Sequence, residues 1–404
     1  MSTFAALWDS LLPIGRDPAT GGYRRFCWTP AELECRAWFE TTAAERQLRV
    51  AADGNGNLFA WWDVSNGGPA VATGSHLDSV PDGGAFDGPL GVISAFAAID
   101  ELRAAGFQPA RPIVVAAFAE EEGGRFGVAC LGSRLLTGAI DPDTARGLLD
   151  GAGITFADAM QSAGHDPARL GPDEDLLGQI ATYVELHVEQ GRALADLDAA
   201  VGLAEGIWPH GRWRLDFTGR ADHAGTAKLA DRADPMLPYA HTVLAARQAA
   251  AGLGTLATIG KVLAEPGAAN AVSSAVHAWL DVRAAGPEPL AATVDQVLAA
   301  ARAAAESHQV AFGWKSESVT PAVSFDAGLR GRLAAALAGQ GIAAPALPTG
   351  AGHDAGILAA RLPTAMLFVR NPTGVSHSPA EHAEAADCAA GVTALAAVLR
   401  ELAA

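Results

Sequence analysis

The sequence predicts an α/β protein whose main domain has a mostly parallel mixed sheet flanked by helices, interrupted by a ferredoxin-like α+β domain. Two observations carry this prediction. The apolar run Pro112–Ala119 has the continuous hydrophobicity of a strand buried on both faces of a parallel sheet, and a second strand-like run at Ala181–Val188 carries Glu185 and His187 on one polar face. From about residue 207 the pattern becomes β-α-β-β-α-β, the order of a ferredoxin-like sandwich. We therefore expect a main domain at residues 1–206 and 320–404, and an inserted domain at 207–319.

The main domain should begin with helices. Residues 1–50 have a helical pattern, with a helix start at Thr29-Pro30-Ala31-Glu32, where Thr29 can cap and Glu32 can complete a capping box. Further elements follow in order: a turn at Asp53–Asn57, strands at Leu58–Asp63 and Pro69–Thr73, a helix at Leu90–Ala105, the strand at 112–119, a mostly polar helical stretch at 134–180 and the strand at 181–188.

The inserted domain alternates strands and helices. Its expected elements are a strand at Arg212–Gly219, a helix at Asp234–Gly252, strands at Thr255–Ala264 and Ser273–Ala284, a helix at Pro287–Ser307 and a strand at Val310–Ser316. The α/β pattern then resumes with a helix at Leu329–Gln340, a strand at Thr364–Val369 and a last helix at Glu384–Leu402.

Composition limits the classes of partner and compartment. The chain has 404 residues, of which 50% are hydrophobic, so it can form substantial cores. Its formal charge of −17 argues against nucleic acid or an anionic membrane as a partner. Four scattered cysteines without CxxC pairing suit a reduced cytosol. No run approaches the roughly 20 apolar residues needed to span a bilayer, so we expect a cytoplasmic protein.

A glycine-rich stretch at Ala72–Val92 carries the first chemical signal. It places His76, Asp78 and Asp87 within a dozen residues, just after a strand. Catalytic loops of open α/β sheets lie at the carboxyl ends of strands, and imidazole and carboxylate are common ligands of divalent metals. The alternative is a surface turn whose His and Asp only form hydrogen bonds.

Further candidate ligands follow other strands. The full set is His76, Asp87, Glu122, His187 and His377. Five such groups are too many for one tetrahedral zinc, and they fit two metals about 3.5–4 Å apart, bridged by a carboxylate and a water. Such a pair suits hydrolysis of an amide-type bond, and Asp78 can accept the second N–H of the His76 ring.

Three adjacent glutamates, Glu120, Glu121 and Glu122, need supply only one ligand and one general base. The residues alone do not choose among them, and a charged run of this kind is often a solvated face. Here the run directly follows a strand predicted to be buried, which favours a role in the site.

Seven segments together resemble the dimetal amidohydrolases of the M20 peptidase clan, in particular the branch of N-carbamoyl-L-amino-acid hydrolases, β-ureidopropionases and allantoate amidohydrolases. In chain order they read GSHLDSVPDGGAFDGPLGV, EEGGRFG, ELHVEQG, DHAG, DVR, GAGHDA and GVSHSP. The resemblance runs nearly end to end. It implies two divalent metal ions (Zn, Mn, Co or Ni) bridged by Asp87, with Glu121 as the base and Glu122 as a ligand.

The resemblance also implies substrate contacts and a partner. It assigns substrate binding to Gln190, His223, Asn270, Arg283 and Gly352, with Arg283 holding the substrate carboxylate. It implies a homodimer formed through the inserted domain, in which His223 reaches the neighbouring site and stabilises the oxyanion. The catalytic residues expected are therefore Glu121, Asp78 and His223.

The implied activity is hydrolysis of the carbamoyl C–N bond of N-carbamoyl-L-amino acids. Phe86-Asp87-Gly88-Pro89-Leu90 looks more like the carbamoylases than the allantoate enzymes. The alternatives are an allantoate or ureidoglycolate amidohydrolase, an aminoacylase or dipeptidase with the same metals, and a non-catalytic binding protein on this fold. A binding protein would be expected to lack a ligand or the base, and every such residue is present in the sequence.

Overall fold

The computed structural model describes residues 3–65 and 67–404, which form two compact units. The main unit runs to Glu205 and resumes at Ser324–Leu347 and Ala351–Ala404. The inserted unit consists of Gly206–Val323 with Pro348–Gly350. In the part of the chain described, no helix is long and apolar enough to cross a membrane.

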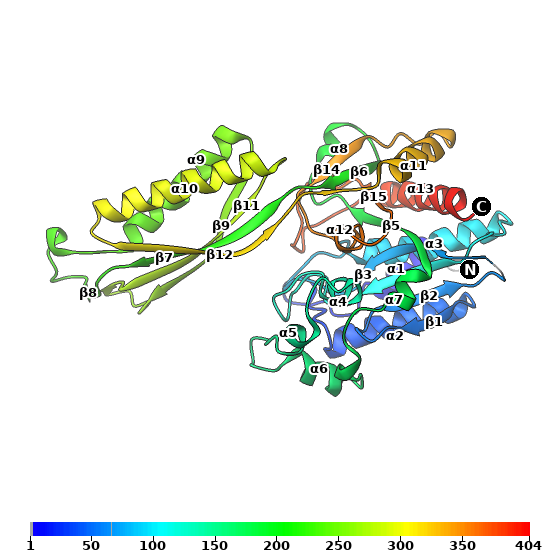
Figure 1. Cartoon of the computed structure of the whole chain (residues 1–404), viewed down its shortest axis with the longest axis horizontal. Helices are drawn as coiled ribbons and strands as arrows, with labels where there is room; N and C mark the ends of the chain where they lie inside the picture. The colour runs from blue at the N-terminus through cyan, green and yellow to red at the C-terminus, as the bar shows by residue number, and fades with distance from the viewer. Residues whose placement is uncertain (1–2, 66) are drawn as a thin grey trace. The chain divides into compact units, whose positions relative to one another are not determined.

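A nine-stranded mixed sheet forms the centre of the main unit (Figure 1). Its strand order is β1-β2-β4-β3-β5-β15-β6-β13, and β14 pairs with β6. The central pairs β4–β3, β3–β5 and β5–β15 are parallel, as the continuous apolar runs predict. The strands are β1 Arg49–Ala52, β2 Leu58–Trp62, β3 Ala70–His76, β4 Ile113–Phe118, β5 Ile180–Val188, β6 Val201–Ile207, β13 Val323–Ser324, β14 Ala346–Thr349 and β15 Thr364–Val369.

Five helices share one large apolar core with alternate residues of this sheet. The helix α3 packs on β3 and lies beside the last helix, α13 (Figure 1). Residues 119–170 close a second core around Phe126 and Phe156. The helices of the first core are α1 Phe4–Leu11, α2 Pro30–Glu45, α3 Pro89–Ala104, α11 Ala327–Gly339 and α13 Ala385–Ala403. The shorter ones are α4 Leu131–Thr137, α5 Pro142–Arg146, α6 Phe156–Ser162, η1 Pro167–Arg169, α7 Glu174–Gly178, α8 Ala193–Asp196 and α12 Asp354–Leu358.

The inserted unit has the element order β-α-β-β-α-β that the sequence predicts. Its antiparallel sheet has the order β12-β7-β11-β9, and the two long helices α9 and α10 lie side by side (Figure 1). Along β11, buried residues alternate with half-buried ones, so one face of the sheet packs into the core and the other remains open. The elements are β7 His210–Thr218, β8 Asp222–His223, η2 Leu229–Asp231, α9 Met236–Leu253, β9 Leu256–Glu265, β10 Ala271–Val272, β11 Ala275–Arg283, α10 Pro287–Ser307 and β12 Ala311–Thr320.

The structure differs from the sequence prediction in local details. Residues 3–50 contain the helices α1 and α2 and the start of β1 rather than helix throughout, and the strands β6, β8, β10, β13 and β14 were not predicted. The predicted capping box is wrong, although Thr29 is the N-cap of α2. The Thr29 hydroxyl donates to the Phe26 carbonyl, and the Glu32 carboxylate accepts the backbone N–H of Trp28 instead of that of Thr29.

Candidate metal centre

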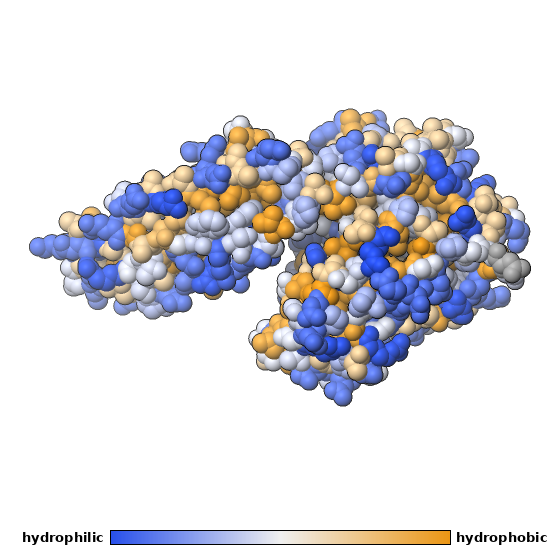
Figure 2. Space-filling model, in the orientation of Figure 1, coloured by the Kyte–Doolittle hydropathy of each residue, from blue (hydrophilic) through white to orange (hydrophobic). Residues whose placement is uncertain are grey.

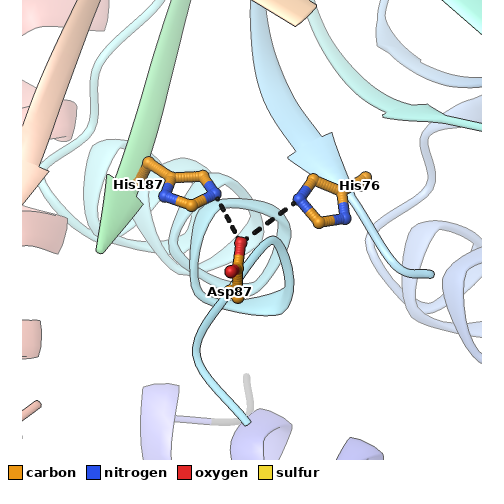
Figure 3. A group of neighbouring side chains, drawn as sticks. All are labelled: His76, Asp87 and His187. Atoms are coloured by element: carbon orange, nitrogen blue, oxygen red, sulfur yellow. Dashed lines mark ion pairs between the residues drawn. The ribbon is translucent and has the colours of Figure 1, made fainter. Parts of the chain in front are cut away.

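Three buried side chains meet at the carboxyl end of the central parallel strands. His76 ends β3, His187 lies near the end of β5, and Asp87 lies in the loop before α3. Gly74 pairs with Glu185 in the β3–β5 register, so the two histidines stand opposite each other on neighbouring strands. The Oδ1 atom of Asp87 lies 3.1 Å from His187 Nε2 and 3.6 Å from His76 Nε2. Figure 3 shows both imidazoles directed at this carboxylate.

A close backbone approach makes this packing possible. Gly88, directly after Asp87, has a φ of +85°, which favours glycine. A Cβ atom at Gly88 would lie 2.4 Å from the His76 ring. The Asp-Gly sequence therefore allows the loop to bring Asp87 against the imidazole.

The second oxygen of Asp87 faces a different group. Its Oδ2 atom lies 3.3 Å from Nε2 of His377, and that nitrogen lies 3.6 Å from Oε2 of Glu122. His377 is in the loop after β15, with half of its side chain exposed. Asp87 thus stands between a buried histidine pair on one side and a Glu122–His377 pair on the other. This is the arrangement that a carboxylate bridging two metal ions requires.

The hydrogen bonds of the His76 and His187 rings show that the cluster fits metal ions. Nδ1 of His76 faces the Asp78 carbonyl at 3.2 Å, and Nδ1 of His187 faces the Val188 carbonyl at 2.9 Å. A carbonyl can only accept, so Nδ1 carries a hydrogen and Nε2 is the ring atom left to bind a metal ion. Both Nε2 atoms are buried, and neither makes a hydrogen bond of normal geometry to any described residue. An imidazole whose Nδ1 donates to a carbonyl is held with Nε2 directed at the site, an orientation suited to metal ligation.

Electrostatics in the cluster favour added positive charge. Burial opposes the charged form of His76, but nearby carboxylates, first that of Glu121, outweigh it and raise the pKa of His76 well above its ordinary value. Burial likewise opposes ionisation of Asp87, but the three surrounding histidines hold the pKa of Asp87 well below its usual range. Burial raises the pKa of Glu122 to about 7, and the charge of Asp87 adds to this. Divalent cations would neutralise this concentration of carboxylates.

The three adjacent glutamates have different environments. The Glu120 carboxylate accepts the backbone N–H groups of Arg125 and Phe126, at 3.0 and 2.7 Å. Glu121 instead places Oε2 3.5 Å from His76 Nε2. Glu122 belongs to the His377 group described above. The geometry brings Glu121 and Glu122 into the cluster and leaves Glu120 as a support of its own loop.

Asp78 supports two parts of the cluster. Its Oδ1 atom lies 3.5 Å from His76 Nδ1, farther than its own carbonyl oxygen. The carboxylate accepts the backbone N–H groups of Glu121 and Glu122, at 3.2 and 3.1 Å. Asp78 therefore holds the glutamate loop at least as directly as it orients the histidine.

The expected substrate residues belong to both units. In the main unit, Gln190 donates to Asp87 Oδ2 at 2.9 Å, and a Cβ atom at Gly352 would meet no atom within 4 Å. In the inserted unit, His223 lies on β8 and accepts the Gly225 N–H through Nδ1. The carbonyl of Asn270 accepts the Ala224 N–H, which places Asn270 beside the His223 turn. Arg283 Nε donates to Asp281 at 2.9 Å.

Two buried residues near the cluster were not predicted from the sequence. The His353 ring lies 4.5 Å from that of His187, and its Nε2 atom has no hydrogen-bond partner among the described residues. The signal for it was the segment GAGHDA, of which only Gly352 was assigned. Glu381, in the loop before α13, contacts the Asp87 loop through backbone hydrogen bonds, for which the sequence carried no specific signal.

Comparisons with known proteins match almost the whole chain. A family model described as Peptidase family M20/M25/M40 matches residues 72–401. The chain is 34% identical to an N-carbamoyl-L-amino acid amidohydrolase of Geobacillus stearothermophilus, covering 96% of each protein. It is 32% identical to an allantoate amidohydrolase of Escherichia coli, over 97% of this chain and 96% of the relative. A crystal structure of AtUAH in complex with (S)-hydroxyglycine aligns with a TM-score of 0.89 and 29% identity, over 99% of this chain and 97% of that one.

Proposed function

Because the chain belongs to peptidase family M20/M25/M40, we propose that it hydrolyses the carbamoyl C–N bond of N-carbamoyl-L-amino acids to the L-amino acid, ammonia and carbon dioxide. The chain is an amidohydrolase acting on C–N bonds other than peptide bonds. The observation that carries the proposal is the position of Asp87, whose two carboxylate oxygens face two different sets of metal-binding groups.

Two divalent ions fit the donor set described above. His76 and His187 would hold one with Asp87, and Glu122 and His377 would hold the other with the same carboxylate. Bound there, the ions would supply Lewis acidity that polarises the ureido carbonyl and makes a water easier to deprotonate. Imidazole and carboxylate ligands accept Zn, Mn, Co and Ni, so the donor atoms do not select one metal.

Glu121 is the proposed general base and then the general acid. Its carboxylate faces the cluster but is not needed to complete either ligand set. Burial raises the pKa of Glu121, which favours uptake of a proton from the attacking water. Glu121 then transfers this proton to the leaving nitrogen. Asp78 keeps the carboxylate in place by fixing the backbone N–H of the same residue.

Substrate binding is assigned to residues of both units. Arg283 would bind the carboxylate of the amino acid, with Asn270 beside it, and Gln190 and the backbone at Gly352 would contact the ureido group. Arg283 lines a surface pocket of about 530 Å³ in the inserted unit, together with Trp279 and Lys261. Arg283 forms an ion pair with Asp281 in the structure, so the carboxylate of the substrate would have to compete with that of Asp281.

We also propose a homodimer formed through the inserted unit, with His223 acting in the neighbouring site. The strands β9 and β12 are at the edges of their sheet and pair with no further strand in the described residues. Apolar side chains are exposed among polar ones on the inserted unit (Figure 2). On α9, Leu237 and Leu244 are exposed. Unpaired edges and exposed apolar residues favour association with a second copy.

The cysteines support a cytoplasmic location for this enzyme. All four are buried and free. Reduced thiols in a chain of this size are typical of a reducing compartment.

An allantoate amidohydrolase is the second candidate, because a relative of that name is nearly as similar as the carbamoylase. Both activities release ammonia from a ureido group and would use the same metal centre. They differ in the rest of the substrate, beyond the ureido group.

Ammonia release by the purified protein, reloaded with Mn²⁺ or Zn²⁺, tests the proposal. The panel contains N-carbamoyl-L-amino acids, their D-enantiomers and allantoate, with Glu121→Gln as the inactive control. We expect turnover of L-substrates only. Activity on allantoate alone would favour the second candidate, and silence on every ureido substrate would contradict both.

A further inference from the structure

Glu381 connects two loops of the metal centre that are far apart in the sequence. Only 5% of this residue is exposed. Its Oε1 atom accepts the backbone N–H groups of Phe86 and Asp87, each at 2.9 Å. Its Oε2 atom accepts the hydroxyl hydrogen of Ser376 at 2.9 Å. One buried carboxylate thus holds the backbone that carries Asp87 and the residue directly before His377.

The Asp87 loop is built closely around this side chain. A Cβ atom at Gly84 would lie 2.3 Å from Glu381 Oε1 and 2.5 Å from its Cβ. Only glycine leaves room for the carboxylate at that position. The two donor groups are backbone atoms, so the contacts fix the course of the chain at Asp87 rather than the rotamer of a neighbouring side chain.

The Ser376 hydroxyl reveals a second effect of Glu381. The Oγ atom is 2.9 Å from Glu381 Oε2 and 3.3 Å from Asp87 Oδ2, but it carries only one hydrogen. Glu381 Oε2 has the shorter contact, so it takes that hydrogen. The lone pairs of Asp87 Oδ2 then remain available on the side that faces His377.

We propose that Glu381 is a positioning residue for the metal ion held by Asp87, Glu122 and His377. It fixes the two loops that carry Asp87 and His377 and keeps the Ser376 hydrogen away from the bridging carboxylate. The inference rests on the two-metal site of the proposed function. The other ion, held by His76 and His187, depends on strands β3 and β5 and needs Glu381 less.

The test is metal binding by the full-length protein without substrate. The metal-free protein is titrated with Zn²⁺ or Mn²⁺, and bound metal is counted after dialysis. We expect two ions in the wild type. Glu381→Ala should bind one ion normally and the second about 10-fold to 100-fold more weakly, the usual effect of removing a residue that orients a ligand.

Glu381→Gln keeps the side-chain volume and guards against misfolding of the alanine variant. The amide oxygen can still accept the backbone N–H groups, but its NH₂ group would face Ser376 and release the hydroxyl hydrogen to Asp87. We expect weaker binding of one ion, with the melting temperature of the metal-free protein unchanged. Glu384→Gln is the matched control, because this exposed carboxylate pairs only with His382 among the described residues.

The outcomes separate this inference from the proposed function. If the wild type binds two ions and both Glu381 variants bind them as tightly, the positioning role is wrong and the metal pair stands. If both ions weaken equally in Glu381→Gln, Glu381 is a general support of the fold, and the inference also fails. If the wild type binds fewer than two ions, the two-metal site itself is overturned together with the inference.

Discussion

Cys130 donates its thiol hydrogen to Oε1 of Glu121, with 3.2 Å between sulfur and oxygen. The backbone N–H of Cys130 also donates to the Glu121 carbonyl at 2.6 Å. Cys130 itself adopts a φ of +55° at the N-cap of α4, a conformation that non-glycine residues seldom take. The residue therefore holds both the backbone and one carboxylate oxygen of the proposed base, leaving Oε2 directed towards His76.

Removal of the thiol should slow turnover without affecting substrate binding. Cys130→Ala should lower kcat about 3-fold to 10-fold with KM unchanged, since a single hydrogen bond contributes about 0.5–1.5 kcal/mol. Cys130→Ser retains a donor and should recover most of this loss. The control is Cys388→Ala in α13, which should lower stability by creating a cavity but leave kcat alone. Equal kcat values for the alanine and wild-type proteins would show that the thiol contact is unimportant.

Substitutions of Glu121 and Glu120 should distinguish the catalytic base from a residue that only stabilises its loop. Glu121→Gln should keep both metal ions and lose activity by about 100-fold or more, because general base catalysis contributes that much. Glu120→Gln is the matched variant one residue earlier, since its carboxylate binds only backbone N–H groups of the loop among the residues described. It should change the melting temperature more than kcat. The measurements are kcat, metal content and thermal unfolding, and near-normal activity of Glu121→Gln would remove it as the base.

The sequence predicts the buried strands of this molecule. It does not predict residues whose role depends on contacts with the backbone of a distant part of the chain. Strand β4 is predicted because burial on both faces requires uninterrupted apolar residues. The polar face of β5 is recognisable because Glu185 and His187 interrupt that rule. Short strands such as β1 and β14 leave no comparable pattern.

The role proposed for Glu381 could not be predicted in the same way. Its partners include the backbone N–H groups of Phe86 and Asp87, almost 300 residues away in the sequence, and backbone groups carry no residue signature. The Glu120–Glu122 run shows the same limit. The residues leave its register open, and only the resemblance assigns one. In the structure Glu121 and Glu122 lie beside His76 and His377, whereas Glu120 accepts backbone N–H groups.

Removal of the metal ions should destabilise the protein. A ligand that binds only the folded state contributes RT ln(1 + [L]/Kd), about 2.7 kcal/mol when present at 100 times Kd. Chelator treatment should therefore lower the melting temperature of the wild type, and added Mn²⁺ or Zn²⁺ should restore it. His187→Asn lacks a proposed ligand, so its unfolding should respond less to the chelator. An identical response in both proteins would argue against His187 as a ligand.

The proposed carboxylate anchor should act on substrate affinity. Arg283→Gln should raise KM for N-carbamoyl-L-amino acids about 10-fold to 100-fold, as expected for loss of a charged hydrogen-bond pair. Arg212→Gln is the control, because Arg212 lines the same pocket and faces the same Asp281 at 3.7 Å. Asp281→Asn removes the carboxylate that now competes for Arg283 and should lower KM or leave it unchanged. A larger effect of Arg212→Gln would place the substrate carboxylate elsewhere.

Mixed dimers can test whether His223 acts across the subunit interface. Glu121→Gln removes the base from a protomer's own site, whereas His223→Ala would remove the oxyanion donor from the neighbouring site. Each variant alone should be nearly inactive.

In a mixed dimer, the site that retains Glu121 receives His223 from the other protomer and is complete. Equal mixing with exchange of subunits should therefore restore about a quarter of the wild-type activity per protomer, because half of the dimers are mixed and each has one working site. If His223 acts within its own chain, no site in the mixture contains both residues, and mixing should restore nothing. Size-exclusion chromatography of each protein before mixing shows whether it is a dimer. A monomer would contradict the proposed interface before any activity is measured.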